Sequence, residues 1–125
     1  MVMGGILNAC MDALQFKFNA SIFKRWKNQG WVDPAISHAN KWKYVDGVCV
    51  GEKFFGSSTF LVFLTDLWHL CKFLMILAVS ASIVFYNPMI NLYSDLFLLY
   101  ISFTVSFEIF YTKIFIIPIR DQNNQ

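Results

Sequence analysis

The strongest constraint on the fold is a long, almost uncharged apolar tract in the C-terminal half. Between residues 54 and 111 the only charged side chains are Asp66, Lys72, Asp95 and Glu108. A helix crosses the hydrocarbon core of a bilayer in about 20 residues, so this tract has room for two crossings. Only 14% of the residues are charged, against about 25% in a typical soluble domain. We therefore expect a small integral membrane protein.

The tract divides at Asn87-Pro88. The residue before a proline is disfavoured in a helix, and proline itself suits the first turn of the next one. We therefore predict an antiparallel transmembrane helical hairpin with helices at 57–86 and 89–117, followed by a polar tail at 118–125. Both predicted helices are apolar around most of their circumference, whereas a soluble helical hairpin needs a wide polar face.

The rest of the chain completes a single all-α membrane domain covering residues 1–125. Residues 4–23 have the apolar spacing of an amphipathic or re-entrant helix, which lies on the membrane or packs across the hairpin. The pattern does not decide whether this segment crosses the bilayer. Residues 26–55 are predicted to be an aromatic-rich cytoplasmic loop. Four of its aromatic residues are expected to anchor at the membrane–water interface: Trp26, Trp31, Trp42 and Tyr44.

The distribution of basic residues predicts the orientation. No basic residue flanks the turn at Asn87, whereas the N-terminal half and the end of the second predicted helix are basic. By the positive-inside rule, both termini of this multi-pass protein are expected on the cytoplasmic side of the cell membrane. The net charge of +2, with no dense basic run, speaks against a nucleic-acid partner.

A polar stripe on the first predicted helix contains the candidate site. At 100° per residue, Asp66 and His69 share one helical face, and in a tight hairpin Glu108 lies at the same depth. Two carboxylates and an imidazole at one depth are candidate catalytic groups, or ligands for a divalent metal. The alternative is structural: with the turn at the far interface, Asp66 and Glu108 lie near the basic interface and form ordinary ion pairs.

The remaining polar residues of the tract are expected to join the helices. The same count places Asp95 beside Ser80 and Ser82, where hydrogen bonds would hold the two helices together. Lys72 is a further helix–helix contact of the stripe. The three cysteines, Cys10, Cys49 and Cys71, are far apart and lack metal-ligand spacing, so we expect free thiols in a reducing compartment or buried in helices.

Several segments resemble a group of small, uncharacterised bacterial integral membrane proteins. The resemblance covers about residues 4–75 and rests on 11–18 (MDALQFKF), 33–37 (DPAIS), 40–43 (NKWK), 51–54 (GEKF) and 57–70 (SSTFLVFLTDLWHL). It implies a membrane location, and a unit in which the loop and the start of the first span belong together. It implies no activity. The chain departs from the group at His38, where an aromatic residue is typical, and this argues against His38 as a ligand.

These features favour a non-enzymatic accessory or interaction subunit that forms a homo-oligomer or binds another membrane protein. Two helices bury little surface on each other, so polar stripes are expected to find partners in other chains. The alternative is a membrane-surface enzyme acting on a lipid or another amphiphile. It would use Asp66, His69 and Glu108, with Asp12 nearby, and a divalent metal as its only cofactor. A phage-type pore former is the third hypothesis.

Overall fold

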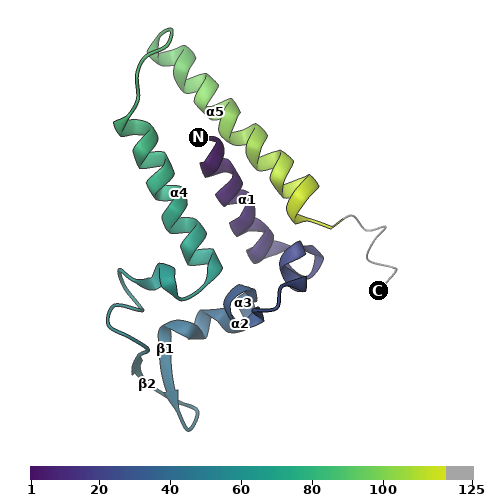
Figure 1. The fold of residues 1–125 in the computed structure, drawn as a ribbon, viewed down its shortest axis with the longest axis vertical. Helices are drawn as coiled ribbons and strands as arrows, with labels where there is room; N and C mark the ends of the chain where they lie inside the picture. The colour runs from purple at the N-terminus through teal and green to yellow at the C-terminus, as the bar shows by residue number, and fades with distance from the viewer. Residues whose placement is uncertain (118–125) are drawn as a thin grey trace.

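Three helices form the main layer of the protein. The computed structural model describes residues 1–117, so the predicted tail at 118–125 lies outside the described residues. The layer contains α1 (Val2–Phe16), α4 (Leu67–Val84) and α5 (Leu92–Ile109), which continues as a π-helical turn, η5 (Phe110–Phe115). Helix α1 lies between the other two (Figure 1).

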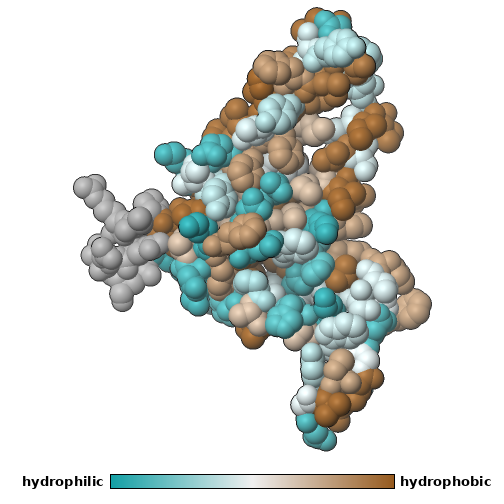
Figure 2. Space-filling model, turned by 180° about the vertical axis from the view of Figure 1, so that it is seen from behind, coloured by the Kyte–Doolittle hydropathy of each residue, from teal (hydrophilic) through white to brown (hydrophobic). Residues whose placement is uncertain are grey.

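The two long helices confirm the predicted pair of candidate spans. Each is long and apolar enough to cross a membrane, and only 11% of the residues in either apolar window are buried. A core helix of a soluble protein would instead be mostly buried. Figure 2 shows brown apolar side chains over the upper part of the molecule, and teal hydrophilic side chains gathered below it. The architecture therefore indicates association with a membrane.

The first span begins later than predicted. Residues 57–66 form turns and a short 3-10 helix, η4 (Val62–Leu64), instead of continuous α-helix. The Ser57 hydroxyl group donates a hydrogen bond to the Lys41 carbonyl oxygen at 2.7 Å, which ties this segment to the preceding loop. The helical start at residue 57 was therefore wrong, because tertiary hydrogen bonds hold the segment in turns.

The second span also begins later than predicted. Asn91 caps α5, since its side chain accepts a hydrogen bond from the Ser94 N–H, and residues 89 and 90 belong to the turn. Asp95 accepts three hydrogen bonds: from the Tyr86 hydroxyl group at 2.7 Å, and from the backbone N–H groups of Met89 at 2.9 Å and Ile90 at 3.2 Å. This carboxylate therefore organises the turn between the spans.

The predicted contact of Asp95 with Ser80 and Ser82 does not form. The Ser82 hydroxyl group donates to the Ala78 carbonyl oxygen of its own helix, and Ser80 is exposed. The reason is that the two spans do not make a tight hairpin. Helix α1 contacts both spans along its length, and within residues 1–117 the spans hardly touch each other directly.

Small residues allow α1 to approach its neighbours closely. Gly5, Ala9 and Ala13 follow at intervals of four and are all buried. A Cβ atom added at Gly5 would stand 3.0 Å from the Phe107 backbone nitrogen and closer still to two oxygen atoms of α5. Such intervals of small residues are typical of helix packing in membranes. The predicted N-terminal helix therefore forms, but it lies inside the helical layer.

The remaining residues form a second layer at one end of the helices (Figure 1). It contains five short helical turns: η1 (Phe18–Ala20), η2 (Ile22–Arg25), α2 (Gln29–Val32), α3 (Pro34–Ser37) and η3 (His38–Lys41). An antiparallel hairpin follows, with β1 (Trp42–Val45) and β2 (Val48–Glu52). The Asp46-Gly47 turn has positive φ angles of 50° and 80°, which match the twist of paired strands.

The β-hairpin corrects two predictions. Residues 26–55 are not a loop without regular structure, and the fold is mostly helical but not all-α. The Asp46-Gly47 signal was visible in the sequence, but a two-stranded hairpin is marginal by itself and needs support. That support includes the Lys53 N–H, which donates to the Lys41 carbonyl oxygen at 3.1 Å.

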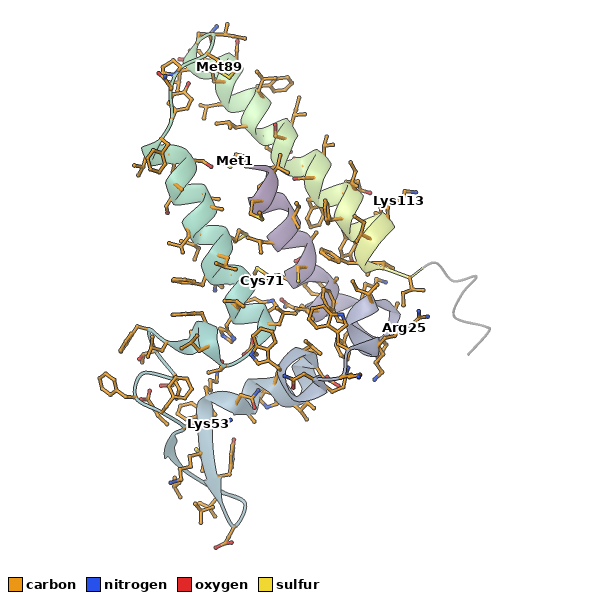
Figure 3. All side chains as sticks on the ribbon, in the orientation of Figure 1. Met1, Arg25, Lys53, Cys71, Met89 and Lys113 are labelled. Carbon is orange, nitrogen blue, oxygen red and sulfur yellow. The ribbon has the colours of Figure 1, made fainter. Side chains whose placement is uncertain are left out.

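The aromatic residues predicted as interface anchors all lie in this second layer. Trp26 and Tyr44 are exposed, while Trp31 and Trp42 are half-buried, and Trp31 packs on the hydrophobic core. In Figure 3, Arg25 and Lys53 lie in this layer, far from Met89 in the turn, whereas Lys113 lies beside the helices, on the stretch that continues α5.

The start of α1 lies toward the turn. Met1 lines a cavity with Ile83, Tyr86 and Leu92, which border the turn between the spans. The first residue therefore lies at the end of α1 that points toward the turn, away from the second layer.

Candidate functional site

The predicted site residues Asp66 and His69 meet at the start of α4. They border an open pocket of about 250 Å³ between the helical layer and the second layer. Its lining residues come from α1, α3, η3 and α4: Gln15, Pro34, Ser37, His38, Asp66, Trp68 and His69.

Asp66 holds the His69 ring in a defined orientation. The His69 Nδ1–H donates to Asp66 Oδ2 at 2.7 Å, and the His69 backbone N–H donates to Oδ1 at 2.9 Å. The Thr65 hydroxyl group donates to the same carboxylate at 3.1 Å. Asp66 is only 3% exposed, whereas His69 is partly exposed. A carboxylate on Nδ1 fixes the tautomer and leaves Nε2 as the reactive nitrogen.

The local structure follows from capping chemistry. Asp is among the preferred N-cap residues because its side chain accepts a hydrogen bond from an unpaired N–H group of the first turn. Asn40 adds a tertiary hydrogen bond, donating from Nδ2 to the Thr65 carbonyl oxygen at 3.0 Å. The second layer therefore holds the start of α4 in place.

Glu108 does not join this pair. It is exposed on α5, which α1 separates from α4. The predicted convergence of three groups was wrong, because it assumed two spans in direct contact. Across residues 1–117, no three His, Cys, Asp or Glu side chains come together as a metal site.

Two further residues of the pocket region differ from expectation. His38, which the sequence argued against, lines the same pocket as His69, and its Nδ1 lies 3.2 Å from the Pro34 carbonyl oxygen. Lys72 does not join the helices; its Nζ lies 5.1 Å from the centre of the Trp68 ring in a cation–π contact. Both contacts join residues four apart in the chain, whereas the meeting of His38 and His69 at one pocket depends on chain reversals that spacing along one helix does not reveal.

A second candidate site lies on the outer face of α5. Tyr100, Thr104 and Glu108 follow at intervals of four, so they fall within an arc of about 80°. All three are exposed, and Tyr100 is 68% exposed. Among the described residues, neither hydroxyl group nor the Glu108 carboxylate has a hydrogen-bond or ion-pair partner. This stripe was not predicted from the sequence, because Glu108 was expected on the inside of the hairpin.

Thr112 extends the α5 stripe but differs chemically. Its hydroxyl group donates to the Glu108 carbonyl oxygen at 2.7 Å and is therefore satisfied within its own helix. The unpaired groups are thus confined to the part of the face that precedes Thr112.

Comparison of the chain with protein-family models, with curated proteins and with solved structures finds no match.

Proposed function

We propose that this protein is a non-enzymatic interaction subunit of a membrane, and that it self-associates through the outer face of α5. The observation that carries the proposal is the unpaired polar stripe of Tyr100, Thr104 and Glu108 on a mostly apolar helix. A hydroxyl group left unpaired in hydrocarbon costs roughly 2–7 kcal/mol. A neighbouring helix that supplies hydrogen-bond partners removes this cost.

The chemistry of the stripe favours a second copy of the chain as the neighbour. Tyrosine and threonine hydroxyl groups both donate and accept hydrogen bonds, so the face is complementary to itself. Glu108 and Lys113 are five residues apart in the continuous helical stretch of α5 and η5, and both are exposed. In a symmetric pair each copy therefore offers both partners of an intermolecular ion pair.

The orientation forms part of the proposal. The second layer, which carries Arg25 and Lys53, faces the cytoplasm, as the positive-inside rule predicts. The turn between the spans and the start of α1 then lie toward the other side of the cell membrane. Support comes from the separation of Arg25, Lys53 and Lys113 from Met89 (Figure 3).

The test measures the subunit number in native-lipid particles by single-molecule photobleaching. We expect a dimer or higher oligomer, and we expect the isosteric changes Tyr100→Phe and Thr104→Val to weaken it. Interhelical hydrogen bonds in membranes average about 0.6 kcal/mol, which corresponds to roughly a threefold higher dissociation constant for each hydroxyl group.

Thr112→Val is the matched control, since it removes a hydroxyl group that already donates to the Glu108 carbonyl oxygen one turn earlier. This variant should assemble as the wild type does. A monomeric wild-type protein with no co-purifying membrane protein would contradict the proposal. A co-purifying protein that is lost on Thr104→Val would instead identify a different partner for the same face.

A second candidate function rests on the Asp66–His69 pair. An oriented imidazole beside an open pocket at the end of a membrane span is suited to acid–base chemistry on an amphiphile. Vesicles of a total lipid extract, incubated with wild-type protein or His69→Ala, would be compared by mass spectrometry, and elemental analysis of both samples would record bound metal. A lipid product or a stoichiometric metal that disappears in the variant supports an enzyme. Identical samples exclude this activity for the lipids present.

A further inference from the structure

Two cysteines from distant parts of the sequence face each other between α1 and α4. The Sγ atoms of Cys10 and Cys71 are 3.4 Å apart, although 61 residues separate them in the chain. Both are buried, with 7% and 4% of their surface exposed, and both belong to the hydrophobic core. Figure 3 shows Cys71 on the side of α4 that faces α1.

We propose that Cys10 and Cys71 form an oxidisable dithiol pair that closes to an intramolecular disulfide bond joining α1 to α4. A disulfide bond needs its sulfur atoms about 2.05 Å apart. The pair is therefore within about 1.4 Å of bonding distance, which side-chain rotation and a small helix shift supply. The small buried residues Gly5, Ala9 and Ala13 bring the backbone of α1 close to its neighbours.

The chemistry requires a two-electron acceptor that enters an apolar environment. Two S–H bonds break and one S–S bond forms, and two electrons and two protons pass to the acceptor. The fitting class is a small, uncharged, lipid-soluble oxidant such as a quinone, which becomes the quinol. Burial protects both thiols from charged oxidants dissolved in water.

The proposed bond would lie directly behind the candidate pocket. Cys71 is two residues from His69 on α4, and Cys10 is five residues from Gln15 on α1. Both His69 and Gln15 line the pocket. Closing the disulfide bond would therefore fix the spacing of the two helices that form these walls.

The third cysteine, Cys49, is exposed on β2 in the second layer. It is replaced in the experiment so that only Cys10 and Cys71 can react. The experiment uses the full chain with Cys49→Ser in native-lipid particles, reduced and then treated with diamide. Diamide is an uncharged azo compound that takes up the two electrons and two protons at its N=N bond. Remaining thiols are alkylated after unfolding and counted by mass spectrometry.

We expect both remaining cysteines to escape alkylation together, with the product running as a monomer on a non-reducing gel. Adding Cys10→Ser should restore alkylation of Cys71. If both thiols stay fully alkylatable after diamide treatment of folded Cys49→Ser protein, the proposal is wrong. It is equally wrong if the disulfide bond forms only between chains, or no faster in folded protein than in protein unfolded in detergent.

Discussion

Replacing Gly5 by alanine tests the close approach of α1 to α5. The new Cβ atom would stand 3.0 Å from the Phe107 backbone nitrogen, and well under 3.0 Å from both Ser106 Oγ and the Phe103 carbonyl oxygen. Two of these three atoms are backbone, so the clash cannot be relieved by a rotamer change alone. Helices α1 and α5 must separate by about 1 Å, and overpacking of this kind typically costs about 1–3 kcal/mol.

The glycine-to-alanine change also has an opposing effect. Alanine in a helix is favoured over glycine by roughly 1 kcal/mol, so this gain must be subtracted from the cost at Gly5. We expect a net loss of up to about 2 kcal/mol in the free energy of unfolding. The assay is unfolding in mixed micelles with increasing sodium dodecyl sulfate, followed by circular dichroism.

Two other glycines provide matched controls. At Gly4 the nearest atom to an added Cβ is a Phe103 ring carbon at 3.2 Å, which can move, so we expect a smaller loss. At Gly30 in α2 the nearest atom is 3.9 Å away, so Gly30→Ala should be neutral or stabilising. Equal stability of Gly5→Ala and Gly30→Ala would refute the close approach of α1 to α5.

Three further changes probe the polar contacts. Asp66→Ala should lower the free energy of unfolding by about 1–2 kcal/mol, whereas Asp66→Asn should keep most of the stability because asparagine also caps helices. Unfolding in detergent measures both variants, and equal losses would contradict the capping role. Asp95→Ala should cost about 1–3 kcal/mol by leaving polar groups of the turn unpaired, and hydrogen exchange would show faster exchange of the turn amides. Hydrogen bonds from the Ser58 hydroxyl group and the Gly56 N–H hold the pKa of Glu52 below its ordinary value. The stabilisation from these hydrogen bonds is therefore present above the ordinary glutamate pKa and is lost as the pH falls through the lowered pKa of Glu52. The NMR chemical shift of the Gly56 amide should follow this titration, and Glu52→Gln should abolish the pH dependence of that shift.

The sequence alone predicts the membrane character and the number of long spans. The apolar tract from residue 54 to 111 and the turn at Asn87-Pro88 are local signals. Helices α4 and α5 lie within the two segments that these signals predict, although both helices begin later than predicted. Asp66 and His69 also come together as expected, because their spacing of three is a property of one helix and its cap.

The tertiary structure decides how the spans relate to one another. The insertion of α1 depends on the fit of Gly5, Ala9 and Ala13 against two other helices, and no local pattern reports which partner a small residue will meet. Once α1 separates the spans, Asp95 bonds to the turn, and Glu108 faces outward. The pairing of Cys10 with Cys71 arises in the same way. Hydrophobicity and helical periodicity determine which segments enter the membrane layer, whereas the shape of their surfaces determines which side chains meet there.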